Sequence, residues 1–170
     1  MTQLRIVPAC PADLEHYIDL LEEIAAWLDS RGVNQWPVGF FRNSVNFFST
    51  CIERGEVQLA FDRNELVGTL RLLEADEIVW PGASDDALYV HSLGIRRARA
   101  GQALGLQLLS WAEQQALTAG KRYLRLDCIA TNPVLRRYYE DVGFSSRGEV
   151  NAHYPMGTYR LQRYEKALSQ

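Results

Sequence analysis

The sequence is poor in the residues that build disulfide frameworks and metal sites. It has three cysteines and three histidines among 170 residues. The cysteines are widely separated and odd in number, which favours reduced thiols over a disulfide framework. Neither these cysteines nor the isolated histidines have the spacing of a zinc site. The residues concerned are Cys10, Cys51, Cys128, His16, His91 and His153. We therefore predict that the protein binds no metal.

Long apolar runs and a large excess of one charge are also missing. No stretch approaches the roughly 20 apolar residues that a membrane helix needs, and the N-terminus lacks a signal-peptide pattern. The net charge of −3 gives no general attraction to nucleic acid or to anionic membranes. We predict a cytoplasmic protein without nucleic-acid or membrane partners.

The composition is that of a globular domain. Hydrophobic residues make up 47% of the chain and charged residues 23%, which is ordinary for a chain that buries a substantial core. No linker, repeat or low-complexity segment interrupts it. We predict a single domain over residues 1–170.

Apolar periodicity and turn residues predict interleaved helices and strands. The expected strands are Leu4–Val7, Val57–Asp62, Leu66–Leu73, Glu77–Trp80, Ala87–Ile95, Tyr123–Ile129, Phe144–Val150 and Thr158–Lys166. The expected helices run from Pro11 to Gly32, Phe41 to Arg54, Ala103 to Ala119 and Pro133 to Val142. This order predicts an α/β (α+β) domain in which a mixed sheet has helices on both faces.

The strongest local signal is a helix entered through the small residues of Ala100–Gly105. Few side chains there would keep a ligand from the free backbone N–H groups, and the helix dipole favours an anion at this end. Small residues at a helix start also serve tight packing of a helix on a sheet. From this segment alone, phosphate binding and tight packing are equal alternatives.

Two segments together resemble the GNAT N-acetyltransferase superfamily. The first, Leu93-Gly94-Ile95 followed by Ala100–Gly105 and Leu108-Leu109, is similar to the acetyl-CoA motif of that family. The second, Asn132 to Phe144, resembles its second motif, an Asn and then a Tyr followed by Glu-x-x-Gly-Phe. The resemblance implies a bacterial-type single-domain member with the GNAT fold, a mixed, mostly antiparallel central sheet of about seven strands.

The resemblance also implies the activity. It points to an acyltransferase that moves an acetyl group from acetyl-CoA, by direct transfer, to a primary amine of a small molecule or peptide. The sequence departs from the family pattern at Ala100, where Arg or Gln is usual, and at Ala103, where Gly is usual. Arg97, Arg99 or Gln102 could replace the lost side-chain contact. These departures motivate an alternative function, a non-catalytic acyl-CoA-binding sensor or regulatory module.

The residues that would bind coenzyme A follow from the same resemblance. They are Leu93, Ile95, Gly101, Gln102, Ala103, Leu104, Gly105, Asn132, Leu135 and Tyr139. The Leu93 N–H would face the thioester oxygen, where negative charge develops. Asn132 before Pro133 is also an ordinary helix N-cap.

Proton transfer would need an acid and, in some mechanisms, a base. The resemblance implies that Tyr139 is the general acid that protonates the departing CoA thiolate. Its chemistry suits that role, since a phenol with a reference pKa of about 10 stays protonated at neutral pH. Tyr138 is the adjacent alternative. His91, two residues before Leu93, has a side-chain type suited to a base, and a purely structural histidine is the alternative. The other candidate bases are Asp76, Glu77 and Asp127, and a water chain without a dedicated base also remains open.

The resemblance to the family implies that the acceptor site forms from the first two helices, their loop and the loop Asn151–Gly157. The candidate lining residues are Trp36, Trp80, Tyr89, His91 and Tyr154, with Gln35, Pro37 and His153 beside them. Aromatic rings with polar tips would suit a small amine, and they could equally cap the core. The sequence does not identify the acceptor. It also leaves the oligomeric state open, with a homodimer as one alternative because dimers are common in this fold.

Overall fold

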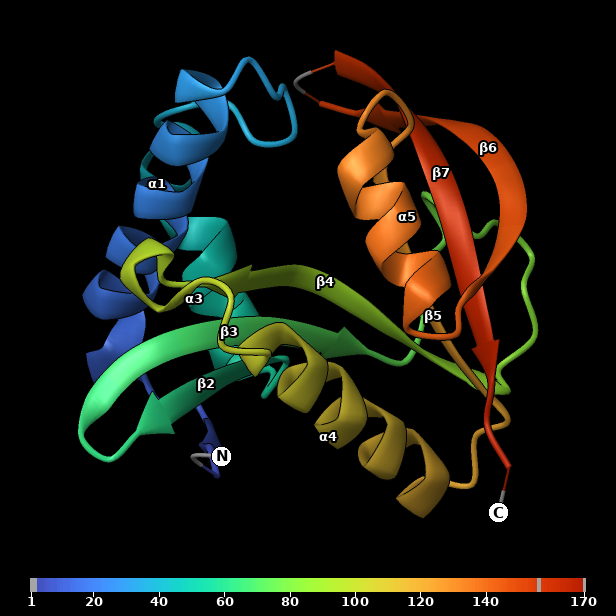
Figure 1. The fold of residues 1–170 in the computed structure, drawn as a ribbon, viewed down its shortest axis with the longest axis horizontal. Helices are drawn as coiled ribbons and strands as arrows, with labels where there is room; N and C mark the ends of the chain where they lie inside the picture. The colour runs from blue at the N-terminus through green and yellow to red at the C-terminus, as the bar shows by residue number, and fades with distance from the viewer. Residues whose placement is uncertain (1–2, 156, 170) are drawn as a thin grey trace. The chain divides into compact units, whose positions relative to one another are not determined.

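The computed structural model describes residues 3–155 and 157–169, so Met156 of the predicted 151–157 loop lies outside the described residues. Its contacts divide the chain into two compact units. The first unit runs to Leu72 and resumes at Ser92–Ser110, and the second comprises Leu73–His91 and the chain from Trp111 onward. Among the described residues, seven strands form one sheet in the order β1-β2-β3-β4-β5-β7-β6 (Figure 1). No helix in these ranges is long and apolar enough to cross a membrane.

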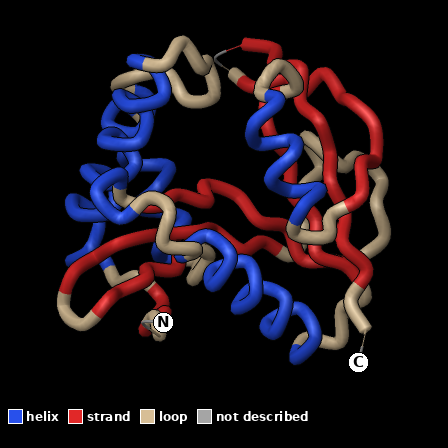
Figure 2. Tube along the Cα trace, viewed as in Figure 1, coloured by secondary structure: helices blue, strands red, loops and turns tan. Residues whose placement is uncertain are grey.

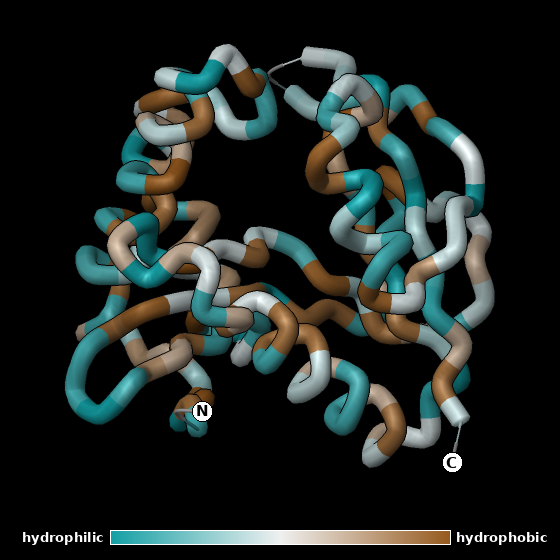
Figure 3. Tube along the Cα trace, viewed as in Figure 1, coloured by the Kyte–Doolittle hydropathy of each residue, from teal (hydrophilic) through white to brown (hydrophobic). Residues whose placement is uncertain are grey.

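Strand β4 (Ala87–Ile95) and helix α4 (Leu104–Thr118) each contribute several residues to both units. The other elements that begin in the first unit are β1 (Arg5–Pro8), η1 (Pro11–Asp13), α1 (Leu14–Ser30), α2 (Phe40–Asn43), α3 (Val45–Glu53), β2 (Val57–Asp62), β3 (Glu65–Leu73) and η2 (Arg97–Arg99). β1 and β3 both pair antiparallel with β2. The predicted β2–β3 hairpin is therefore confirmed, and Figure 3 shows its turn as hydrophilic.

The core of the first unit follows from the apolar spacing of α1. Its buried residues recur three and four positions apart, as an amphipathic helix requires. They pack with buried residues of α2, α3 and β2 into one cluster. The cluster contains Tyr17, Ile18, Leu21, Ala25, Phe41, Phe48, Cys51, Ile52, Val57 and Leu59. Gly32, with a φ of 68°, follows the end of α1 in the left-handed conformation that glycine adopts readily.

Two glycines let elements of the first unit approach closely. A Cβ at Gly94 would lie 2.5 Å from Ile24 Cδ1 of α1. A Cβ at Gly68 would lie 2.7 Å from Ile95 Cδ1 and 3.1 Å from Leu108 Cδ1 of α4. A Cβ at either position would force these neighbouring side chains to shift, so glycine allows the observed packing of α1 on β4 and of α4 on β3 without strain.

The second unit is built on a long antiparallel ribbon of two strands, β6 and β7. Figure 1 shows this ribbon with α5 beside it, and Figure 2 shows its strands and loops by colour. The elements of the unit are β5 (Tyr123–Ile129), α5 (Pro133–Asp141), β6 (Ser145–Tyr154) and β7 (Gly157–Ala167). β7 pairs antiparallel with both β5 and β6. β5 pairs in parallel with the N-terminal part of β4, from Ala87–Tyr123 to Val90–Leu126.

A buried arginine organises the core of the second unit. Arg125 Nε donates to Glu165 at 2.7 Å and Arg125 Nη1 donates to the Tyr89 hydroxyl at 2.9 Å. Its guanidinium also lies 5.1 Å from the centre of the Trp80 ring. A charge this buried is tolerated because it is paired and hydrogen-bonded.

The structure corrects two of the predicted elements. Glu77–Trp80, predicted as a strand, is a turn in which Asp76 Oδ1 accepts the Val79 N–H at 3.0 Å. A side chain that bonds the backbone two or three residues on competes with strand pairing. The predicted helix Phe41–Arg54 is two helices, α2 and α3, which meet at Ser44.

The close approach at Gly94 yields a stability prediction. We expect Gly94→Ala to lower the free energy of unfolding by about 1–3 kcal/mol, because the added methyl overpacks the contact with Ile24. Ile24→Val removes the clashing Cδ1 atom and alone should cost about 0.5–1.5 kcal/mol. Urea unfolding of the single and double variants measures both effects.

The double variant provides the control. If the clash causes the loss, Gly94→Ala with Ile24→Val should be less destabilised than the sum of the two single variants, by about 0.5 kcal/mol or more. Simple additivity would contradict the packing account.

Candidate functional site

The segment before α4 has the backbone of an anion site. Gly101 and Ala103 have φ values of 78° and 56°, and α4 begins at the next residue, Leu104. Within the described chain, the N–H groups of Gly101, Gln102 and Ala103 donate to no protein acceptor. No atom lies within 4 Å of the position that a Cβ on Gly101 would occupy. Adjacent free N–H groups with left-handed residues among them, at the start of a 15-residue helix, fit a pyrophosphate.

Ala103, where the family pattern has glycine, adopts a backbone conformation that favours glycine. Its φ of 56° is in the left-handed region, which costs a residue with a Cβ on the order of 1 kcal/mol. Neighbouring contacts must supply that energy.

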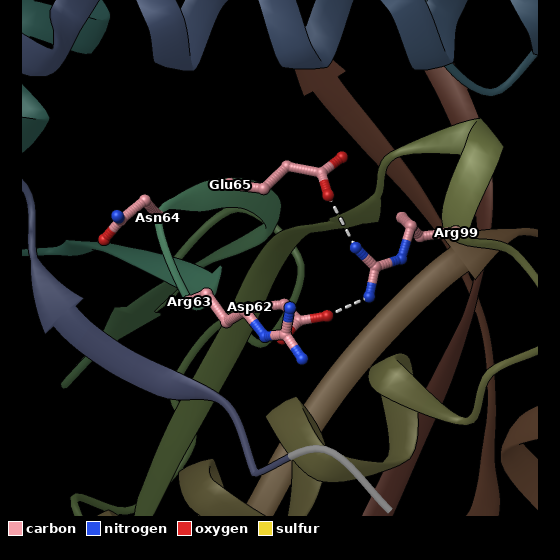
Figure 4. Close-up of a pocket in the computed structure, with 5 residues that line it drawn as sticks. All are labelled: Asp62, Arg63, Asn64, Glu65 and Arg99. Carbon is pink, nitrogen blue, oxygen red and sulfur yellow. Dashed lines mark hydrogen bonds and ion pairs between the residues drawn. The ribbon is translucent and has the colours of Figure 1, made fainter.

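Arg99 fastens this segment to the β2–β3 turn. Its Nη1 donates to Glu65 Oε2 at 2.6 Å, its Nη2 pairs with Asp62, and its Nε donates to Gln102 Oε1 at 3.0 Å. Figure 4 shows the guanidinium reaching both carboxylates across an open pocket of about 400 Å³, which Arg63 and Asn64 also line. No sequence pattern indicates this tether, because Arg99 lies more than 30 positions from both of its carboxylate partners.

These contacts correct one expectation. Arg99 and Gln102 were candidates to replace the side-chain donor missing at Ala100, and both are engaged with protein groups. The third candidate, Arg97, stacks over Trp27 at 3.5 Å from the ring centre. A phosphate contact of Arg97 stays a prediction, and the groups of this segment that donate to no described protein acceptor are its backbone N–H groups.

Strand β4 becomes irregular where the predicted thioester-binding residues begin. Its parallel pairing with β5 ends at Val90–Leu126, although β5 continues to Ile129. Ser92 has a φ of 50°, a strained value for a residue with a side chain. Leu93 and Ile95 follow it and are half-buried.

Helix α5 begins with the predicted cap. Asn132 Oδ1 accepts the Leu135 N–H at 3.1 Å, and Pro133 occupies the first helical position. This confirms the structural part of the prediction for Asn132. Its contact with a cofactor, and that of Leu135, stay predictions.

Tyr139 of α5 is held in an aromatic cluster. Its ring centre lies 5.5 Å from Tyr138, 6.0 Å from Phe144 and 5.8 Å from Tyr164. Burial raises the pKa of Tyr139 well above its ordinary value, and Cys128 and Asp127 add to the effect. No described residue hydrogen-bonds its hydroxyl. Tyr139 is thus a protonated phenol at neutral pH with an uncommitted O–H.

Three of the four candidate bases come together in the second unit. His91 Nε2 lies 2.9 Å from Asp76 Oδ2, and one ligand atom each of His91, Asp76 and Asp127 lies within 4.8 Å of the others. Burial raises the pKa of Asp127 to about 6, His91 opposes that effect and Asp76 adds to it. The fourth candidate, Glu77, is exposed and accepts the Gly82 N–H at 3.3 Å. The sequence suggested these groups only as alternatives to one another.

This cluster also offers the ligand types of a cation site. In this structure, however, His91 Nε2 and Asp76 Oδ2 are hydrogen-bonded to each other. That bond uses one potential metal-ligand atom of each residue. The absence of a bound metal stays a prediction.

The candidate acceptor residues have different surroundings. Trp36 is half-buried and packs edge-on against Phe41, 5.3 Å between ring centres. Tyr154 is half-buried and lies 5.9 Å from Tyr159. Trp80 and Tyr89 are only 7% and 3% exposed, within the core around Arg125. Their burial corrects the expectation that they line an acceptor site, and their role in this structure is packing.

Comparisons with known proteins agree with the two motifs. The model of the acetyltransferase (GNAT) family matches residues 21–144. An uncharacterized N-acetyltransferase, YesJ of Bacillus subtilis (strain 168), is 34% identical over 148 residues, covering 82% of each chain.

Solved structures share the fold. A GNAT-family acetyltransferase from Listeria monocytogenes 4b F2365 is 29% identical with a TM-score of 0.78, covering 97% of this chain and 95% of its own. The PaiA N-acetyltransferase from Thermoplasma acidophilum, in complex with coenzyme A, is 18% identical with a TM-score of 0.69, covering 96% and 98%.

The predicted fold and the predicted resemblance are therefore confirmed. Family membership also confirms the predicted acyltransferase activity and acetyl-CoA as the acetyl donor. The segment before α4 fits the diphosphate of that donor through its free N–H groups. This chain belongs to the GNAT family of acetyltransferases.

Proposed function

We propose that the protein transfers the acetyl group of acetyl-CoA directly to a primary amine of a small molecule or peptide. The observation that carries this proposal is Tyr139, a buried phenol that keeps its proton at neutral pH and donates it to no described residue. A module that only binds acyl-CoA has no need of such an acid. We also propose that residues 1–170 act as one acetyltransferase domain, since the family match spans segments of both units.

The state of the buried cysteines supports direct transfer over an acyl-cysteine route. Burial raises the pKa of Cys51 to about 11 and that of Cys128 to about 12. Because the thiolate is the nucleophilic form, both thiols are poor nucleophiles at neutral pH.

Each predicted site residue then has one role. Acetyl-CoA supplies an acetyl group activated as a thioester. Residues 101–105 bind its diphosphate through backbone N–H groups, and the Leu93 N–H donates to the thioester oxygen. Tyr139 gives its proton to the departing sulfur. His91 takes a proton from the amine, and Trp36 and Tyr154 remain the candidate acceptor contacts.

Release of free CoA from acetyl-CoA tests the function directly. The panel contains small primary amines, amino acids and peptides with free N-termini, and mass spectrometry identifies the acetylated product. Turnover on at least one amine supports the proposal. Saturable acetyl-CoA binding without turnover on any of them would favour a sensor instead.

Tyr139→Phe should lower kcat by about 100-fold or more, because the variant loses the proton donor and keeps the ring. Steady-state kinetics on the best amine measures kcat, and calorimetry measures CoA binding, which should change little. Tyr138→Phe is the matched control on the same helix and should keep nearly full activity. The assignment fails if the two variants lose activity equally.

Arg99→Gln should raise KM for acetyl-CoA by about fivefold and leave kcat within about twofold. The reason is that the variant releases the diphosphate segment from the β2–β3 turn, and a loosened site loses preorganisation. Arg63→Gln, in the same pocket, makes no such tether and should behave as the wild type. An unchanged KM in Arg99→Gln would show that the tether does not matter for binding.

A further inference from the structure

His91 lies between two carboxylates that come from different segments. Asp76 belongs to the turn before β4, and Asp127 lies on β5. The His91 and Asp76 side chains are 21% and 7% exposed. The imidazole is thus largely shielded from water and keeps a solvent-accessible part, which suits a group that must exchange protons.

The Asp76 carboxylate is fixed in place by its own turn. Its Oδ1 accepts the Val79 N–H at 3.0 Å, and its backbone carbonyl accepts the Trp80 N–H at 2.9 Å. Val79 and Trp80 are buried, which anchors the turn in the core of the second unit. The second oxygen, Oδ2, is then directed at His91 Nε2.

Charge decides which nitrogen of His91 carries the proton. Burial alone would raise the pKa of Asp76, but hydrogen bonds from His91 and from the Val79 and Ile78 N–H groups outweigh it and hold that pKa below its ordinary value. Asp76 is therefore a carboxylate at neutral pH and can only accept. His91 must supply the hydrogen, so Nε2 is protonated and Nδ1 is the nitrogen that can gain a proton.

Asp127 has a different environment. No described residue donates a hydrogen bond to its carboxylate. It lies within 4.8 Å of both His91 and Asp76 through one atom of each. An imidazolium at His91 would offset the repulsion between the two carboxylates, so the pair favours the protonated histidine.

We propose that Asp76 and Asp127 are positioning residues that prepare His91 to accept a proton, Asp76 by fixing its Nε2–H tautomer and Asp127 by stabilising its imidazolium. This inference rests on the proposed amine acetylation. In that reaction an N–H bond of the amine breaks, the nitrogen keeps the electron pair, and the proton passes to His91 Nδ1, directly or through water. The imidazolium then returns the proton to solvent.

The tautomer of His91 can be observed without any acceptor. Long-range proton–nitrogen NMR of the full-length ¹⁵N-labelled chain separates the two ring nitrogens of its three histidines. Single substitutions of His16 and His153 assign the signals, and exposed His16 serves as the internal reference. We expect His91 to show a fixed Nε2–H tautomer in the wild type, unlike His16.

The variants distinguish the two carboxylates. Asp76→Asn should release the tautomer and lower the titration midpoint of His91 by about one pH unit or more. Asp127→Asn should keep the tautomer and lower the midpoint. Circular dichroism checks that each variant is folded, and Asp76→Glu, which restores a carboxylate, should recover part of the wild-type behaviour.

Three results would overturn the inference. His91 titrating like His16 in the wild type would do so, as would an unchanged tautomer in folded Asp76→Asn. Stoichiometric Zn²⁺ or Mg²⁺ binding that shifts the His91 signals would replace the relay with a cation site. Failure of every amine in the turnover assay is a separate outcome, since it removes the proposed function and leaves the NMR result unaffected.

On the best amine, Asp76→Asn should also lower kcat/KM by about tenfold or more near neutral pH. The acidic limb of its pH profile should move to lower pH by the shift that NMR measures. A purely structural role for Asp76 would lower activity without moving that limb.

Discussion

The break in regular pairing along β4 is the constraint on which the rest of the site depends. Pairing with β5 stops at Val90–Leu126, and Ser92 then takes a left-handed conformation. Such a residue costs on the order of 1 kcal/mol and persists only where surrounding contacts hold it. Two residues further on, Gly94 lies close to Ile24 of α1. The strand therefore supplies buried core residues up to Val90, and from His91 onward mostly half-buried residues, to which we assign chemical roles in the proposed reaction.

The titratable side chains Tyr139, Asp127 and Asp76 of the second unit have pKa values that are shifted by their environment. Tyr139 keeps its proton because its ring is enclosed by aromatic neighbours, and Asp127 has a raised pKa because it is removed from water without a donor. Asp76 is also buried, yet its pKa is lowered, since three hydrogen bonds stabilise its charge. One region of the fold thus holds a protonated phenol, a carboxylate that stays ionised and a carboxyl group whose pKa is raised by burial to about 6.

Sequence patterns predicted the elements whose structure is set locally. The strands Val57–Asp62, Ala87–Ile95 and Tyr123–Ile129 have the predicted boundaries, because apolar residues, glycine and turn residues delimit them. The turn at Asp76–Trp80 was predicted as a strand, since its apolar pair Val79-Trp80 also occurs in strands. The aromatic residues Trp80 and Tyr89 were predicted at an acceptor site. In the structure both contact the buried Arg125, Tyr89 through a hydrogen bond and Trp80 through its ring, and no sequence pattern indicates these contacts.

By itself the sequence determined the family, the small-residue entry to α4 and the tyrosine four residues before Gly143. These features are local, because spacing along one helix or one turn fixes where their groups lie. The tertiary structure decided the partners of Arg99 and the meeting of Asp76, His91 and Asp127. Those contacts join segments far apart in the chain, and only the packing of the sheet determines which distant side chains become neighbours.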